Sequence, residues 1–288
     1  MDNKKTDMKY VVLLVSIVML GSCFGNLSQT ALNSMFAGMA QDFGVDAGVG
    51  QWVTTLYMLV LGITVPAVTY LMRRFVLKNV IIASLVLLVL GGVVDALAWN
   101  FGLLIAGRVL QAISAGITMP MMMSLIMTSV PPERQATAMG ISGIAMGFAP
   151  NIGPTIGGWM LETTGWRSFF VVLAFCSLLL TLVAIAVIKK TPPEDSQMRL
   201  DGISLLQSAL GFGGLLLGFS NASSYEFTSP FIWAPVIVGA IFLIFFIRRQ
   251  RRIEYPLIHL EIFHSKQYRV SFWASNFLYA SFMGITLI

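Results

Sequence analysis

Long apolar runs alternate with short polar segments along almost the whole chain. Their length matches membrane spans, since about 20 helical residues cross a bilayer core of roughly 30 Å. Because that core offers no water to unpaired backbone groups, each run is expected to be helical. We therefore predict an all-α, polytopic transmembrane helix bundle with spans at residues 10–38, 51–72, 80–98, 101–128, 137–161, 168–188, 202–221, 230–247 and 270–288.

Composition supports a membrane protein. Of 288 residues, 57% are hydrophobic and 11% are charged, with a mean hydropathy of +0.82. Soluble domains carry about 25% charged residues. A soluble globular class is therefore excluded, and the lipid bilayer is the first partner that the sequence predicts.

The basic residues indicate the orientation of the spans. Of the 18 Lys and Arg, all except Arg108 and Arg167 fall in segments on one side of the predicted membrane, including Lys4, Lys5 and Arg199. The positive-inside rule makes that side cytoplasmic. We predict a multi-pass protein of the cell inner (cytoplasmic) membrane with a cytoplasmic N-terminus. Short basic clusters between apolar runs, without interleaved aromatic residues, do not indicate nucleic-acid binding.

A polar, Pro-rich segment at residues 189–202, KKTPPEDSQMRLDG, predicts a domain boundary. We expect a six-span N-terminal bundle over 1–190, a cytoplasmic linker with two central spans over 191–247, and a cytoplasmic amphipathic segment with the first span of an incomplete C-terminal bundle over 248–288. Residues 248–269 are predicted to form a helix along the membrane surface. The chain ends inside an apolar run, which predicts that it belongs to a longer sequence.

The first span has a polar stripe. Asn26, Gln29 and Asn33 follow one another at steps of three and four, with Thr30 beside them, so these side chains share one helical face. Polar groups within a span face protein or a water-filled cavity. The stripe predicts either hydrogen bonds between helices or the wall of a transport cavity.

The fourth span contains a permanent charge, Arg108, with Gln111 on the same face. At about 1.5 Å per residue, Arg108 lies roughly 10 Å inside the outer end of the span. An unpaired charge at that depth costs at least a few kcal/mol, which makes Arg108 a functional candidate. The structural alternative is an ion pair or carbonyl clamp that only ties helices together.

The fifth span concentrates helix breakers in GFAPNIGPTIGGWM, residues 147–160. The GxxxG spacing allows close approach of helix backbones, and the prolines remove amide donors and favour kinks. We expect a bent helix with a close-packing face where two bundles meet. The residues concerned are Gly147, Pro150, Gly153, Pro154, Gly157 and Gly158.

These features resemble the major facilitator superfamily and, within it, the fourteen-span multidrug/proton antiporter branch of the EmrB/QacA type. Residues 147–160 are similar to the antiporter motif of that branch, the Arg108–Gln111 stretch to a superfamily motif, and EYPLIHLEIFHSKQYR, residues 254–269, to the segment before its ninth span. The resemblance implies a six-helix bundle, two linker spans and a partial second bundle. It also implies export of small hydrophobic or cationic compounds in exchange for protons by alternating access, and we expect a monomer at full length.

Two departures from the family pattern matter. In the loop between spans two and three, Thr69, Arg73 and Val76 stand where Gly, Asp and Gly are common, although the cytoplasmic gate implied by the resemblance retains basic residues at Arg73, Arg74 and Lys78. In span one, Ser28 stands where many members have an acid. Asp95, near the outer end of span three, is an alternative proton site, or is simply hydrated there.

No GxxxxGK[ST], HExxH or GxSxG motif occurs in the sequence. Transport is therefore expected to use an ion gradient, without a cofactor or enzymatic activity, and the pair His259 and His264 lacks the third ligand of a metal site. Two alternatives remain open: a symporter or uniporter of small metabolites, favoured by the missing acid in span one, and a non-transporting membrane partner or receptor fragment.

Overall fold

The computed structural model describes residues 8–50, 52–193, 195, 200–222, 225–253, 256–258 and 260–286. Within these residues every regular element is helical, which confirms the all-α class. The elements are α1 (Met8–Phe43), α2 (Ala47–Gly50), α3 (Trp52–Thr64), η1 (Val65–Ala67), α4 (Val68–Arg74), α5 (Leu77–Ala96), α6 (Phe101–Ser129), α7 (Pro132–Thr163), α8 (Trp166–Val187), α9 (Gly202–Asn221), α10 (Pro230–Gln250), η2 (Leu260–His264) and α11 (Lys266–Thr286).

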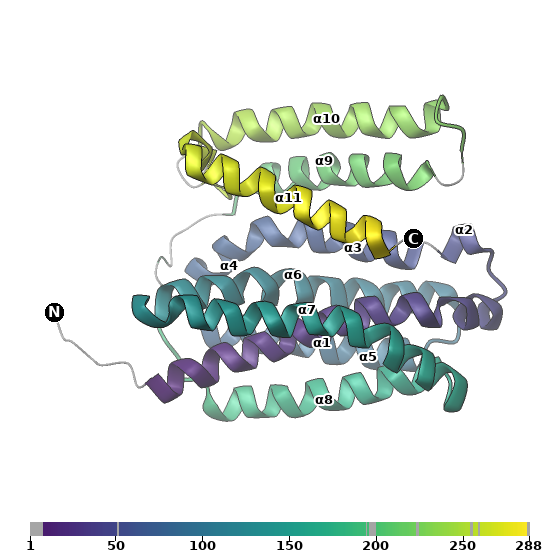
Figure 1. Ribbon diagram of the computed structural model, residues 1–288, viewed down its shortest axis with the longest axis horizontal. Helices are drawn as coiled ribbons and strands as arrows, with labels where there is room; N and C mark the ends of the chain where they lie inside the picture. Colours follow the sequence, from purple (N-terminus) through teal and green to yellow (C-terminus); the bar gives the residue numbers. More distant parts are fainter. Residues whose placement is uncertain are drawn as a thin grey trace.

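A helix occupies each of the nine predicted spans, and among the described residues 7 of these segments are long and apolar enough to cross a membrane. One is Trp52–Arg74, which consists of the consecutive elements α3, η1 and α4, with Pro66 inside η1. The helices α7 and α11 are outside that set. In α7 the glycines, Glu133, Arg134 and Asn151 dilute the apolar residues, yet the helix lies within the same bundle as its neighbours (Figure 1).

Helices α1 and α3 to α8 pack side by side with roughly parallel axes (Figure 1). Two apolar clusters fill the bundle. The first, nearer the N-terminal end of α1, contains Val18, Leu85 and Met121, and the second, nearer the C-terminal end of α1, contains Met35 and Phe170. A smaller third cluster contains Tyr57, Ala112 and Ala115. By residue position along α6, it lies between the two larger clusters.

Helices α9 and α10 form an antiparallel pair beside α3 (Figure 1). Glycines allow their backbones to approach: a Cβ on Gly214 would lie 2.6 Å from the carbonyl oxygen of Pro235. Such contacts between small residues replace hydrophobic association in lipid. The hydroxyls of Thr55 and Ser220, 3.2 Å apart, link the pair to α3.

An ion pair joins the start of α9 to the end of α10. Arg249 donates from Nε and Nη2 to the two carboxylate oxygens of Asp201, at 2.6 and 2.9 Å. The hydrogen bond from Arg249 lowers the pKa of Asp201 to about 2, and a bond from Ser204 also lowers it. The pair therefore stays ionised through the physiological pH range.

The single surface helix expected over 248–269 is not found in the described residues of that segment. Helix α10 extends to Gln250 and is followed by turns. Among the described residues between α10 and α11, the only helical element is the five-residue η2. Pro256 lacks an amide donor, which disfavours a continuous helix at this point. The side-chain oxygen of Gln250 also accepts from the amides of Leu257 and Ile258, at 2.6 and 3.3 Å, which replaces helical bonding there.

Candidate functional site

Arg108 lies at the centre of a buried polar cluster inside the bundle. Its side chain is 1% exposed, and Gln111 and Ser28 are both fully buried. Arg108 Nη1 donates to Gln111 Oε1 at 2.6 Å and to Ser28 Oγ at 2.8 Å. Ser28 in turn donates to Gln111 Oε1 at 2.7 Å. These bonds join α1 to α6, so the serine that replaces the expected acid is a direct partner of the arginine.

Tyr57 of α3, which was not among the residues predicted from the sequence, forms another side of this cluster. The Arg108 guanidinium carbon lies 4.3 Å from the centroid of the Tyr57 ring, a cation–π geometry. The Tyr57 hydroxyl donates to the carbonyl oxygen of Gly25 at 3.2 Å. A lone tyrosine within an apolar span was the only sequence signal, and it does not reveal its partner on α6.

Asp95 lies beside the cluster and is fully buried, so the expectation that it is simply hydrated near the outer end of its span is wrong. The absence of a side chain at Gly107 makes room for it, because a Cβ at Gly107 would overlap the Asp95 carboxylate. Gly91, four residues before Asp95 on α5, has a similar role, because a Cβ there would lie 2.8 Å from the carbonyl oxygen of Gly107. The α5–α6 crossing therefore holds an acid and a base in one buried region.

Several polar atoms in this region have no hydrogen-bond partner among the described residues. They are both carboxylate oxygens of Asp95, Nε and Nη2 of Arg108, and Nε2 of Gln111. Burying charged groups costs several kcal/mol per ion unless they are paired. A carboxyl group that is buried without a hydrogen-bond partner among the described residues is a candidate proton site.

The polar stripe of α1 is divided between two neighbours. Asn26 donates to the sulfur of Met146 in α7, at 3.6 Å, and Gln29 donates to the sulfur of Met58 in α3, at 3.4 Å. The Thr30 hydroxyl donates to the carbonyl oxygen of Asn26, one turn earlier in α1, at 3.0 Å. Asn33 is exposed. None of these four side chains hydrogen-bonds to Arg108 in the described structure, so the stripe and the buried cluster are separate groups.

Helix α7 continues through both prolines and curves in its second half (Figure 1). The side chain of Asn151 donates from Nδ2 to the carbonyl oxygen of Gly147, one turn earlier, at 2.6 Å. A Cβ on Gly157 would lie 2.6 Å from the carbonyl oxygen of Ala31, and one on Gly153 would overlap Thr30. By contrast, Cβ atoms on Gly147 and Gly158 would meet nothing within 4 Å. The close-packing face at Gly153 and Gly157 is thus used within the bundle, against α1.

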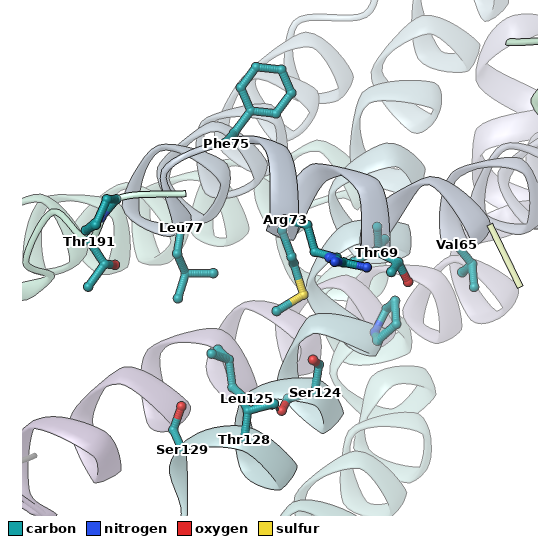
Figure 2. Close-up of a pocket in the computed structure, with 14 residues that line it drawn as sticks. Val65, Thr69, Arg73, Phe75, Leu77, Ser124, Leu125, Thr128, Ser129 and Thr191 are labelled. Carbon is teal, nitrogen blue, oxygen red and sulfur yellow. Dashed lines mark hydrogen bonds between the residues drawn. The ribbon is translucent and has the colours of Figure 1, made fainter. Parts of the chain in front are cut away.

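The three basic residues expected at a cytoplasmic gate, Arg73, Arg74 and Lys78, each contact a different part of the structure. Lys78 donates to the carbonyl oxygen of Ile185 at 2.7 Å and so caps the end of α8. Arg74 lies 5.9 Å from the Phe75 ring centroid. The side chain of Arg73 lines a pocket of about 490 Å³ between α4 and α6, across from Ser124 and Thr128 of α6 (Figure 2). Lys4, Lys5 and Arg199 of the predicted basic set are outside the described residues.

Across the residues that the structure describes, no group of three or more His, Cys, Asp or Glu side chains is close enough to hold a metal ion. His264 contacts the carbonyl oxygen of Glu261 at 3.2 Å. His259 is outside the described residues.

Comparison with known proteins places this geometry in a family. Residues 18–288 match the family described as Major Facilitator Superfamily. The chain is 35% identical over 277 residues to the uncharacterized MFS-type transporter YcnB of Bacillus subtilis, covering 96% of this chain and 58% of that protein. It is 36% identical over 263 residues to the lincomycin resistance protein LmrB of Bacillus subtilis, covering 90% of this chain and 54% of that protein.

A more distant relative is the multidrug export protein EmrB of Haemophilus influenzae, with 24% identity over 279 residues, covering 96% of this chain and 55% of that protein. Among solved structures, a peptide transporter POT in complex with sulfate superposes with a TM-score of 0.62 at 14% identity, covering 85% of this chain and 53% of that one. At this identity the likeness concerns the fold alone. The chain spans about half the length of the curated relatives it matches.

Helical spans, a buried charged cluster and glycine-mediated helix crossings thus agree with the sequence matches, which indicate a transporter rather than an enzyme: the chain belongs to the Major Facilitator Superfamily.

Proposed function

We propose that this chain belongs to a proton-coupled antiporter that exports small hydrophobic or cationic compounds by alternating access, in the fourteen-span branch of the superfamily. The observation that carries the proposal is that Asp95 and Arg108 are buried in one region at the α5–α6 crossing, where neither carboxylate oxygen of Asp95 has a hydrogen-bond partner among the described residues. Charged side chains within spans mark ion and proton pathways far more often than they serve as structural elements. Relatives named for lincomycin and multidrug resistance support a drug-like substrate.

In this proposal Asp95 carries the exchanged proton. When Asp95 is ionised, Arg108 is its counter-ion, and when Asp95 is protonated, the guanidinium relies on Ser28, Gln111 and the Tyr57 ring. The change in pairing alters how tightly α6 is held to α1 and α5. Repositioning these helices would change the accessibility of the polar stripe of α1, Asn26, Gln29, Thr30 and Asn33.

The test is dye efflux from energised cells that express the gene at its full natural length. Efflux by the parent protein should cease when a proton uncoupler is added. Asp95→Asn should lower efflux driven by the proton gradient at least tenfold, while substrate exchange without a gradient continues. If Asp95→Asn transports and responds to the uncoupler as the parent does, then Asp95 does not carry the proton.

A symporter or uniporter of small metabolites is the second candidate, and the presence of Ser28 at the position of the expected acid favours it. The direction of transport separates the two. An antiporter lowers the cellular content of the dye under an inward proton gradient, whereas a symporter raises the content of its substrate under the same gradient.

A further inference from the structure

The second span, Trp52–Arg74, is interrupted at η1, directly after a tight contact with α6. A Cβ on Gly116 of α6 would lie 2.8 Å from the Thr64 Cβ, so the end of α3 is packed closely on α6. The Thr64 hydroxyl donates to the carbonyl oxygen of Val60 at 2.7 Å. A hydroxyl bonded one turn back often bends a helix, and a 3-10 turn inside a helical span often marks a hinge. The span is therefore fixed on α6 up to Thr64 and able to bend immediately after it.

Beyond η1, a pocket of about 490 Å³ separates α4 from α6. Thr69 of α4 lies on one wall, and Ser124 and Thr128 of α6 lie on the other (Figure 2). Pro120 also lines the pocket and removes an amide donor from the α6 ladder at this level. Small hydroxyl side chains on both walls allow two helices to approach closely in a membrane. The seven residues of α4, Val68–Arg74, therefore form a short flap that can move about η1 without α3.

The segment that follows α8, residues 188–193 and 195, extends from α1 to this flap, and we call it the strap. Its first residues are anchored. Ile188 is buried at 2% exposure within the first apolar cluster. The Lys189 amide donates to the Tyr10 hydroxyl oxygen at 3.2 Å, and the Lys189 ammonium lies 5.5 Å from the centroid of the same ring.

The far end of the strap is attached to the flap. Thr191 and Pro192 line the pocket between α4 and α6. The Asp195 amide then donates to the carbonyl oxygen of Arg73, in the last turn of α4, at 3.0 Å. Carbonyl groups in the last turn of a helix have no partner within that helix. This bond therefore holds the free end of the flap to the strap.

We propose that the strap latches the flap away from α6, and that breaking the Asp195–Arg73 bond lets the flap swing about η1 and close the pocket. Packing of one helix on another favours closure within a membrane. The chain continues from the strap into α9, so displacement of α9 relative to α8 pulls on the latch. As a gate for solutes the flap rests on the transport function proposed above. It adds a part that moves within the first bundle rather than together with it.

The latch is tested with two cysteines on opposite walls of the pocket, Met72→Cys and Thr128→Cys, after removal of Cys23 and Cys176. A disulfide needs Cα atoms roughly 4.4–6.8 Å apart, so its rate of formation in the purified 288-residue chain in nanodiscs follows the time that the flap spends on α6. Asp195→Pro removes the latching amide, whereas Asp195→Ala keeps it. We expect the Pro variant to form the disulfide about two- to tenfold faster than the Ala variant, the range for one hydrogen bond.

The hinge is tested with the same cysteine pair. Pro66→Ala restores an amide donor within η1 and stiffens the span, so the disulfide should form more slowly than in the parent pair. Pro235→Ala, inside α10, is the matched control and should leave the rate unchanged.

Three results would overturn the proposal. Equal rates for Asp195→Pro and Asp195→Ala, or a slower Pro variant, would reject the latch, and an unchanged rate for Pro66→Ala would reject the hinge. No disulfide in any variant, although both cysteines react with a maleimide, would reject the movement. The measurement needs no transport. Latch-dependent cross-linking without efflux by the full-length protein would reject the transport function and leave the flap intact, whereas efflux without such cross-linking would reject the flap alone.

Discussion

At the scale of single residues, the buried guanidinium of Arg108 shows how much one side chain depends on its neighbours. It has the Tyr57 ring on one side and the oxygens of Ser28 and Gln111 on another. Removing one hydrogen-bond partner from a buried polar group typically costs about 1–3 kcal/mol, and more for a charged group, because the group is left unsatisfied. The neighbours of Arg108 are therefore as important to the site as Arg108 itself.

Tyr57 allows these contributions to be separated. Tyr57→Leu removes the aromatic face, worth about 2 kcal/mol for a desolvated cation–π contact. Tyr57→Phe keeps the ring and removes only the hydrogen bond to Gly25, about 1 kcal/mol. We expect the Leu variant to unfold at a clearly lower temperature than the Phe variant, measured by thermal unfolding of the purified chain. Equal unfolding temperatures would show that the ring does not support the guanidinium.

Some of this residue-level picture could be predicted. Arg108, Gln111 and Asp95 stand out because charged and amide side chains are rare within spans. Ser28 and Tyr57 do not stand out, since a serine or tyrosine in a span is common and its importance depends on which helix lies opposite. The separation of Asn26, Gln29 and Asn33 from Arg108 has the same cause, because helical spacing places residues on a face but does not identify what that face contacts.

At the scale of helices, the α1–α7 crossing is set by glycine. The expectation that the glycines of span five form a contact between two bundles is modified for Gly153 and Gly157, whose missing side chains admit α1 of the same bundle. Gly147 and Gly158 face open space in the described structure. The GxxxG spacing predicts that another helix approaches closely, but it does not indicate which helix that is.

Adjacent glycines in α7 provide a matched pair of variants. Gly157→Leu would drive a side chain into the Ala31 carbonyl, and overpacking of this kind costs typically 1–3 kcal/mol or more. Gly158→Leu places the same side chain in open space. We expect Gly157→Leu to abolish efflux and to lower the unfolding temperature, and Gly158→Leu to fold like the parent. Similar behaviour of the two variants would argue against a tight α1–α7 crossing.

At the scale of the whole molecule, the arrangement follows from the bilayer. Apolar spans must be helical, and the positive-inside rule predicts that the clustered Lys and Arg lie on the cytoplasmic side. Helices α9 and α10 form a glycine-packed pair beside α3, closed by the Asp201–Arg249 ion pair. The predicted boundaries at residues 190 and 247 stay predictions, because the contacts between helices do not divide the chain into independent units.

Orientation is testable with single cysteines in a variant from which Cys23 and Cys176 have been removed. A cysteine at Gly44, in the turn after α1, should react with an impermeant maleimide added to intact cells. A cysteine at Arg251, in the turn after α10, should react only after the cells are permeabilised. The reverse result would invert the predicted membrane topology.

The sequence by itself determined the helical class, the number and place of the long helices, and the family, because the bilayer imposes length and polarity rules that each segment obeys independently of the others. The tertiary structure decided which helices cross closely, that Asp95 is buried beside Gly107, that Tyr57 and Ser28 surround Arg108, and that a pocket separates α4 from α6. These features arise between segments far apart in the chain, where the packing of one helix surface against another, rather than local periodicity, decides which side chains meet.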